Sequence, residues 1–268
     1  MWINTYAAAI TAAFLGGQVC HGGDSGWQHG WDTPADSWWG YGGLNLSPLT
    51  EQEVSFIAKT YPITAISFCP GPQNATTQAG ILAAAKELKA ANPDIKILQY
   101  FNVDQFACYK PTDPTYATFL AHPEWQLKDD FGNFLQPPRI DPTNADAAAF
   151  WTSVPLSVAG SEKYIDGVLA DGGAIYTSAY HLKNFSAARL AALDQAQFNM
   201  IASLQEKFTA ANGGKVIANG MTGGPVNPAD PFNLKALNYV DGIENEHYGV
   251  FEQVLRPSGA LDKDKVCV

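Results

Sequence analysis

The chain has 268 residues, of which 46% are hydrophobic and 16% are charged, and its formal net charge is −10. This length is typical of one α/β barrel, and the low charged fraction argues against an intrinsically disordered chain. The acidic balance argues against a nucleic-acid partner, because phosphate contacts need clustered Lys and Arg, and the sequence shows no basic patch.

The amino-terminal segment predicts secretion. Residues 6–17 (YAAAITAAFLGG) form an apolar run that is too short to span a bilayer and is typical of a secretory signal peptide. We expect a signal peptide over residues 1–19 and a single domain over residues 20–268, secreted and without membrane association after cleavage. The alternative is an ordinary buried helix or strand.

Two further features favour an extracellular protein. The four cysteines predict one or two disulfide bonds, against the alternative of free thiols, and none has the close spacing of a zinc site. Three N-glycosylation sequons predict a glycoprotein. The sequons begin at Asn45, Asn74 and Asn184.

Strand and helix patterns alternate along the rest of the chain. A first strand is expected within the Trp- and Gly-rich segment 20–45, and Thr50 with Glu53 forms a capping box that begins a helix ending near residue 60. Further strands are expected over 63–69, 95–101, 164–170, 215–219 and 240–246, with another beginning at 265–268. Further helices are expected over 78–91, 116–121, 186–211 and 232–237.

The middle of the chain carries two more specific predictions. The piece Asp-Asp-Phe-Gly-Asn within residues 125–135 is typical of a hairpin turn. A helix is expected to begin at Thr143 with Asp146 in the capping position. Pro155 is expected to kink or end that helix, because proline lacks a backbone N–H.

The strand–helix–strand spacing predicts an α/β fold with parallel strands and right-handed crossovers. The length favours a (β/α)8 TIM barrel. Eight strands are not visible, so we expect either a complete barrel or one that is incomplete at its C-terminus. The alternative is a doubly wound open sheet, which lacks the support of a Gly-rich nucleotide loop.

Two stretches of similar design each end in a carboxylate. In YIDGVLADGG the strand runs into Asp171, and in YVDGIENEHYG the same register places Glu246 opposite Asp171. Asp166 and Asp241 also match, but each precedes a glycine where a strand begins, so we interpret them as turn or cap residues. The functional residues of a barrel lie where strands end, which makes Asp171 and Glu246 the candidate catalytic pair.

Strand-end residues of this kind suit cleavage of a glycosidic bond. One acid protonates the leaving oxygen, and the other acts as nucleophile or activates water. We expect no cofactor, and the scattered histidines indicate no metal site. The residues expected to bind sugar through hydroxyl contacts or ring stacking are Tyr100, Asn102, Asp104, Asn219, Glu244, Trp38 and Trp39.

Several strings in the chain resemble a known family. ILQYFN, WQLKDDFGNFLQPPRIDPTNADAAAFW, YIDGVLADGG and VDGIENEHYG are similar to segments of hypothetical glycosyl hydrolase family fifteen. More distantly, the chain resembles polygalactosaminidase-type and α-galactosidase-like barrels. The resemblance implies a TIM barrel, extracellular carbohydrate processing and an acid pair at the ends of the fourth and sixth strands, which are Asp171 and Glu246.

The leading hypothesis is therefore a secreted glycoside hydrolase whose partner is a poly- or oligosaccharide. A second hypothesis is a catalytically silent carbohydrate-binding barrel, which would keep the aromatic and amide residues without a competent acid pair. A polysaccharide lyase is a third alternative. A lyase should carry Arg or Lys at the strand ends, and the expected strand ends have none.

Overall fold

The computed structural model describes residues 37–41, 48–67, 76–106, 109, 112–159, 163–172, 184–218, 239–243 and 266–267. Several predictions fall outside these residues, namely the signal peptide 1–19, the helix 232–237 and the sequons at Asn45 and Asn74. The same is true of three residues expected in the site, which are Asn219, Glu244 and Glu246.

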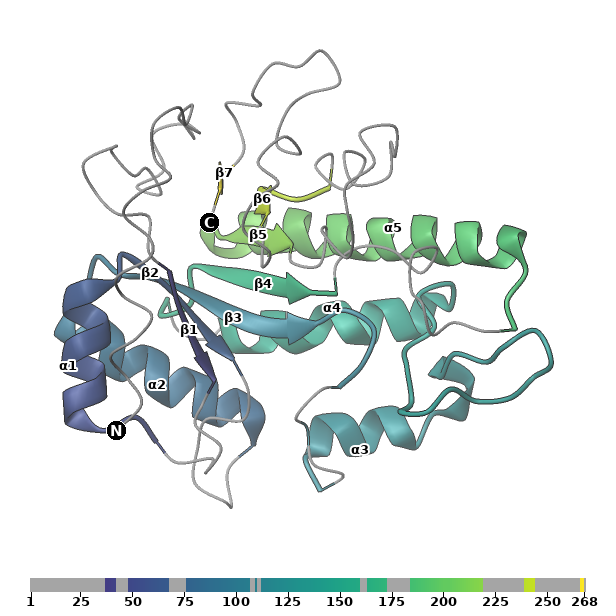
Figure 1. The fold of residues 1–268 in the computed structure, drawn as a ribbon, viewed down its shortest axis with the longest axis horizontal. Coiled ribbons are helices and arrows are strands. Elements are labelled where there is room, and N and C mark those ends of the chain that lie inside the picture. The colour runs from purple at the N-terminus through teal and green to yellow at the C-terminus, as the bar shows by residue number, and fades with distance from the viewer. Residues whose placement is uncertain are drawn as a thin grey trace, which may run out of the picture.

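Strands and helices alternate through the described residues (Figure 1). The strands are β1 (Ser37–Tyr41), β2 (Ile63–Ser67), β3 (Lys96–Asn102), β4 (Gly167–Asp171), β5 (Lys215–Ala218), β6 (Gly242–Ile243) and β7 (Val266–Cys267). The helices are α1 (Glu51–Thr60), α2 (Thr77–Ala91), α3 (Pro114–Leu120), α4 (Ala145–Ala159) and α5 (Ala187–Asn212), with a 3-10 turn, η1, at Pro123–Trp125. Among these helices, none combines the length and the apolar character needed to cross a membrane.

The strands form one sheet in the order β1-β2-β3-β4-β5-β6-β7, and the neighbouring strands are parallel. A doubly wound sheet reverses its strand order at a switch point, so the sequential order excludes that alternative for the described strands. Sequential parallel strands joined by helices are the arrangement of a (β/α) barrel, which confirms the predicted fold class. The strands expected within residues 20–45 and 265–268 are observed as β1 and β7.

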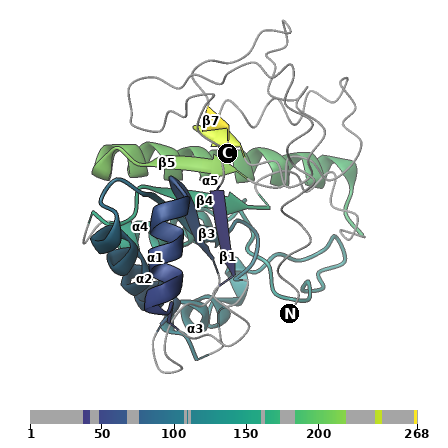
Figure 2. The same cartoon turned by 60° about the vertical axis from the view of Figure 1, so that its left-hand side comes forward.

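The two faces of the sheet bury different side chains. On one face Ile97, Val168 and Val216 belong to a large cluster that includes residues of α1, α2, α4 and α5. Figure 2 shows α1, α2 and α4 together on one side of β3 and β4. The opposite face is the barrel interior, because side chains alternate along a strand. Its cluster consists of Ile63, Ala65, Leu98, Tyr100, Leu169 and Ile217.

Side-chain caps begin α1 and α5 where the sequence predicts. The Thr50 hydroxyl accepts the Glu53 N–H at 3.2 Å, and the Glu53 carboxylate accepts the Thr50 N–H at 2.7 Å. At the start of α5, the Ser186 hydroxyl accepts the Arg189 N–H at 3.3 Å. The helix ends at Gly213, whose φ of 72° favours glycine.

The predicted start of α4 at Thr143 is wrong. The helix begins at Ala145, and its cap is Asn144, whose side-chain oxygen accepts the N–H groups of Asp146 at 3.0 Å and Ala147 at 3.1 Å. Thr143 instead donates its N–H to the Asp141 carboxylate at 2.9 Å. An asparagine fits the cap as well as a threonine does, so the local sequence alone offered both.

Pro155 does not end α4, which continues to Ala159. A proline inside a helix costs about 3 kcal/mol, because one hydrogen bond is lost and the ring crowds the preceding turn. Trp151, Val154 and Val158 lie on both sides of Pro155 and bury their side chains in the main cluster. Burying each such side chain contributes about 1.5–3 kcal/mol, which outweighs the cost of the proline.

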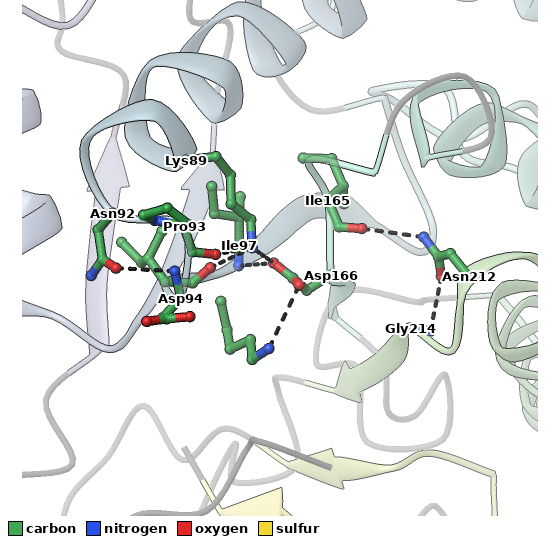
Figure 3. A network of polar contacts seen from close by, with 11 residues as sticks. Lys89, Asn92, Pro93, Asp94, Ile97, Ile165, Asp166, Asn212 and Gly214 are labelled. Carbon is green, nitrogen blue, oxygen red and sulfur yellow. Dashed lines mark hydrogen bonds and ion pairs between the residues drawn. The ribbon is translucent and has the colours of Figure 1, made fainter.

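Asp166 joins the amino ends of β3 and β4, so the prediction of a turn or cap residue is corrected (Figure 3). Its carboxylate accepts the Ile97 N–H at 2.8 Å and pairs with Lys89 at 2.8 Å and with Lys96 at 4.0 Å. Its own N–H donates to the Ile97 carbonyl at 2.8 Å. Asp166 is therefore an inter-strand contact at the end of the sheet opposite the strand ends that carry Asp171.

Asp241 makes contacts of the same kind two strands further along, between β5 and β6. Its carboxylate accepts the Val216 N–H at 3.0 Å and pairs with Lys215 at 3.3 Å, and its N–H donates to the Val216 carbonyl at 2.8 Å. The glycine after the first aspartate has a packing role. A Cβ at Gly167 would lie 2.5 Å from the Lys215 carbonyl oxygen and 2.7 Å from the Leu98 side chain. We call these two sets of contacts the amino-end clamps.

Candidate functional site

Asp171 is the last residue of β4 and lies at the carboxyl edge of the sheet. The expected strand ended one residue earlier. Asp171 pairs in register with Asn102, the last residue of β3. It has the strand parity of Leu169, and Asn102 has the parity of Leu98, so both polar side chains lie on the interior face of the sheet. This is the edge at which barrels place functional residues.

Among the described residues, Tyr100, Asn102 and Gly172 donate hydrogen bonds to the Asp171 carboxylate. The Tyr100 hydroxyl and the Asn102 amide both donate to Oδ2, the second at 3.2 Å. The Gly172 N–H donates to Oδ1 at 2.9 Å, with φ of 68° at this glycine. Asp171 therefore accepts hydrogen bonds through both carboxylate oxygens. The turn at Asp-Gly therefore also orients the carboxylate.

Tyr100 and Asn102 were expected to bind sugar, and the structure brings both onto Asp171. Tyr100 is 7% exposed and Asn102 is 8% exposed. The side-chain oxygen of Asn102 accepts the N–H groups of Asp104 and Gln105, each at 3.1 Å. The indole N–H of Trp151 on α4 donates to the Asn102 carbonyl at 3.1 Å. These contacts fix the end of β3 and favour a positioning role for its side chains.

Asp104 follows β3 and forms an ion pair with Arg139. Its carbonyl also accepts the Ile140 N–H at 2.8 Å, and Gln105 forms an antiparallel bridge with Arg139. The two charged side chains are 16% and 13% exposed. Asp104 therefore connects the loop after β3 to residues 139–140. Its expected contact with sugar stays a prediction.

Gln197 was missed by the sequence reasoning. It lies on α5, is 2% exposed, and its amide donates to the Gly172 carbonyl at 3.0 Å. A neutral polar residue between apolar residues on the buried side of a helix is the signal that could have found it, because buried amides need partners. Gln197 supports the turn that carries the Gly172 N–H.

The other expected site residues lie on β1 or outside the described residues. Trp38 and Trp39 lie on β1, paired with Thr64 and Ala65 of β2. Asn219 would follow Ala218, the last described residue of β5, which pairs with the residue before Asp171. Glu244 and Glu246 follow β6 in the sequence and, like Asn219, lie outside the described residues.

The described residues offer no metal site, and α1 carries a surface hollow. No group of three or more His, Cys, Asp or Glu side chains in them could hold a metal ion. A hollow of about 520 Å³ lies along the outer surface of α1, between Glu51 and Thr60. It is lined by that helix alone and is remote in sequence from the strand ends, so we do not assign it a role.

A sequential parallel sheet with a polar carboxyl edge is the arrangement of an α/β barrel, whose functional residues lie at that edge. The model of hypothetical glycosyl hydrolase family 15 matches residues 89–260, which is more than half of the chain. The chain belongs to this family. The match includes β3, β4 and β5, and therefore the residues around Asp171. The curated proteins contain no match to the chain.

Solved structures with a similar fold include several glycosidases. A trehalose-6-phosphate hydrolase from Bacillus licheniformis aligns with 10% identity and a TM-score of 0.49, over 86% of this chain and 51% of its own. A β-galactosidase from Marinomonas ef1 aligns with 9% identity and a TM-score of 0.49, over 82% of this chain and 42% of its own. This chain spans about a quarter to a half of the length of the solved structures it matches. Likenesses this distant carry no inference about activity or substrate.

Proposed function

We propose that the protein is a glycoside hydrolase that cleaves O-glycosidic bonds in a poly- or oligosaccharide with two carboxylates. Asp171 is the nucleophile or base, and Glu246 is the acid/base. The observation that carries the proposal is the Asp171 carboxylate on the interior face of the sheet, oriented by Tyr100, Asn102 and Gly172. Membership of a glycosyl hydrolase family supports the same chemistry.

The geometry suits the first step of glycoside cleavage. A carboxylate that attacks a sugar carbon or activates water must keep a fixed direction, and three donors from two segments restrain Asp171. The second acid must protonate the leaving oxygen from within about 10 Å, the upper range for both stereochemical outcomes. The repeated clamps support Glu246, because Gly167 and Gly242 occupy equivalent positions, and Asp171 and Glu246 each follow four residues later.

The remaining expected residues complete the proposal. Asp104, Asn219 and Glu244 would hold sugar hydroxyls near the strand ends, and Trp38 and Trp39 would stack on sugar rings. Secretion is also proposed, supported by the apolar run at residues 6–17 and by the sequons. Because barrel interiors are filled with side chains, the substrate would lie over the carboxyl edge of the sheet.

The test is hydrolysis of a panel of glycans by the wild-type protein, Asp171→Asn and Glu246→Gln. General acid–base groups contribute about 10²- to 10⁴-fold, so each variant should lose activity by this order. Asp94→Asn is the matched control, because Asp94 is exposed and lies at the opposite edge of the sheet. Full activity of both site variants would show that the assignment is wrong. Binding of glycans by a wild-type protein that cleaves none would identify a silent carbohydrate-binding barrel.

A further inference from the structure

Exposed aromatic side chains concentrate on one hairpin. Antiparallel bridges pair Gln126 with Ile140 and Lys128 with Phe134, and we call this segment hairpin 126–140. Large hydrophobic side chains are exposed at three positions of the described residues, and two of them, Phe131 and Phe134, lie on this hairpin. Phe131 is 77% exposed at the tip. Isolated exposed apolar residues are ordinary, but two on one short turn indicate a contact surface.

Hydrogen bonds hold the tip of the hairpin in one conformation. The Asp129 carboxylate accepts the N–H of Phe131 at 3.0 Å, the N–H of Asn133 at 2.8 Å and the Asn184 amide at 3.2 Å. The hairpin turn predicted from the sequence is thus confirmed, with φ of 85° at Gly132. Since the backbone of Phe131 is fixed, the ring is displayed from a rigid turn, which lowers the entropic cost of binding.

The hairpin is also anchored to the start of α5. The Asp130 carboxylate accepts the Ser186 N–H at 2.7 Å, and the Asp130 N–H donates to the Asn184 carbonyl at 3.0 Å. Leu127 on the hairpin and Leu193 on α5 are fully buried in a small cluster of their own. Figure 1 shows the segment between α3 and α4, which contains the hairpin, and the first turn of α5 beyond the arrowheads of β3 and β4, on the side where the candidate site lies.

A polar cavity of about 440 Å³ lies beside the exposed tip. Its lining includes Lys128, Asp130, Gly132, Asp141 and Arg189. An ion pair at 3.3 Å between Arg189 and Asp141 crosses from α5 to the end of the hairpin. The volume is within the range of small-ligand sites. Carboxylates accept hydrogen bonds and Lys and Arg donate them, so the lining can bind hydroxyl groups of either polarity.

Bonded contacts connect this surface to the candidate site. Arg139 on the hairpin pairs with Asp104, whose N–H donates to Asn102, and the Asn102 amide donates to Asp171. The hairpin is itself part of the segment that follows β3, so it lies among the loops at the carboxyl edge. A chain-like substrate at Asp171 can therefore extend towards hairpin 126–140.

We propose that hairpin 126–140 is a glycan-binding subsite for an uncharged polysaccharide or oligosaccharide. The Phe131 ring packs against the C–H face of a sugar, and Asp130, Asp141 and Arg189 bind hydroxyl groups in the adjacent cavity. Carboxylates outnumber cations in the cavity lining, and the chain carries a net charge of −10, which disfavours uronate-rich glycans. This subsite rests on the proposed hydrolase function for its role in placing substrate.

The test is native affinity electrophoresis in gels that contain amylopectin, galactomannan, xyloglucan or polygalacturonate. We expect at least one neutral polysaccharide to retard the wild-type protein, and polygalacturonate to retard it less. Phe131→Ala should weaken binding about five- to tenfold through loss of the aromatic contact. Phe56→Ala is the matched control, because Phe56 is an exposed phenylalanine on α1, away from the hairpin, with 57% of its surface exposed. Its migration should equal that of the wild type.

Two readouts separate this subsite from the catalytic assignment. Asp171→Asn should lose hydrolysis but keep the retardation, whereas Phe131→Ala should keep turnover of a short aryl glycoside and lose the retardation. Equal retardation of Phe131→Ala and wild type would overturn the subsite, as would a wild-type protein that no neutral gel retards or that polygalacturonate retards most. Full activity of Asp171→Asn would instead overturn the catalytic assignment and leave the subsite standing.

Discussion

Asp171 is a strand-end carboxylate whose direction is set by its neighbours. Tyr100 and Asn102 come from β3, and Gly172 from the turn that Gln197 supports. Hydrogen bonds to a charged group contribute about 1.5–3 kcal/mol each, so their loss would release the carboxylate from its position. Tyr100 is therefore a positioning residue in the proposed reaction, and its role differs from sugar stacking.

Tyr100→Phe tests this role. It removes one hydrogen bond to Asp171 and should lower kcat by about 10- to 100-fold, the kinetic equivalent of that bond. KM should stay nearly unchanged, because the ring is 7% exposed and contacts the carboxylate. Steady-state kinetics on a cleaved glycan separate the two parameters. A raised KM with unchanged kcat would favour a substrate-binding role, and Tyr116→Phe is the control for a tyrosine outside the strand ends.

At this scale the sequence indicated Asp171 but not its partners. Tyr100 and Asn102 stood out as strand-end residues, yet their bonds to Asp171 join residues about 70 positions apart. Such contacts depend on the register between β3 and β4, and one residue of slip would turn the side chains to the other face. Neither the ion pair of Asp104 with Arg139 nor the buried Gln197 amide has a local sequence signal of comparable strength.

Elements are joined at their amino ends by charged contacts. In the clamp of β3 and β4, Asp166 bonds both a backbone N–H and Lys89, whose side chain is 12% exposed. Removing one partner of such a pair leaves a largely buried charge without compensation. In the second clamp, at β5 and β6, Asp241 likewise accepts a backbone N–H, that of Val216, and pairs with Lys215.

Asp166→Ala should therefore destabilise the fold. We expect the free energy of unfolding to fall by about 2–3 kcal/mol, measured by denaturant titration with an unchanged m-value. Asp94→Ala, a neighbouring exposed aspartate, should change it by less than about 0.5 kcal/mol. Similar small effects of both substitutions would show that the clamp contributes little. Activity of the folded fraction should be kept, because Asp166 lies at the far edge of the sheet.

Hairpin 126–140 should loosen in acid. Burial raises the pKa of Asp129, but hydrogen bonds from Asn133, Asn184 and Phe131 outweigh it and lower that pKa below its usual value. A lowered native pKa means that the stabilisation is present above the unfolded value, about 3.9, and is lost as the pH falls through the native pKa. Amide protection factors of Phe131 and Asn133 should be constant from pH 7 to 5 and fall below about pH 4.

The control for the acid effect is Asp129→Asn, which keeps an acceptor oxygen without the titrating charge. This variant should show lower protection of the same two amides at neutral pH and no step below pH 4. A pH step of equal size in the variant would assign the loosening to another group. The measurement is hydrogen exchange followed by NMR, corrected for the intrinsic rate at each pH.

Element types were predictable where local signals agreed. The capping box at Thr50 and the Ser186 and Gly213 ends of α5 have strong local chemistry, and all were confirmed. At α4 the local sequence misled, because three candidate caps lie within four residues and packing around Trp151 carries the helix past Pro155. These decisions depend on tertiary contacts that a single sequence does not encode locally.

At the scale of the whole molecule, the described strands form one sheet in chain order, so their carboxyl ends all lie along a single edge. Alternating elements predicted this class from the sequence, because βαβ units impose parallel strands. The order itself needed the structure, since the doubly wound alternative has the same alternation. The order also decides whether Asp171 and Glu246 can share a site, because Asp171 ends β4, Glu246 follows β6 in the sequence, and β5 lies between these two strands.

A double variant tests that shared site. If both carboxylates act in one reaction, Asp171→Asn with Glu246→Gln should lose no more activity than the more severe single variant, because residues of one catalytic unit are not additive. Losses in kcat/KM that multiply would indicate that the two residues act independently. Circular dichroism of each variant should match the wild type, which separates catalytic loss from unfolding.

The amino-end clamps have a consequence for the evolution of this scaffold. In β4, the residues that secure the strand precede Gly167, and the residue proposed for chemistry is Asp171, at the opposite end. Mutations near Asp171 therefore leave the amino-end contacts that hold the strands in register intact. Substitutions at the carboxyl edge can therefore change specificity while the contacts at the amino edge keep the fold stable. Laboratory libraries for altered glycan preference belong at the carboxyl edge.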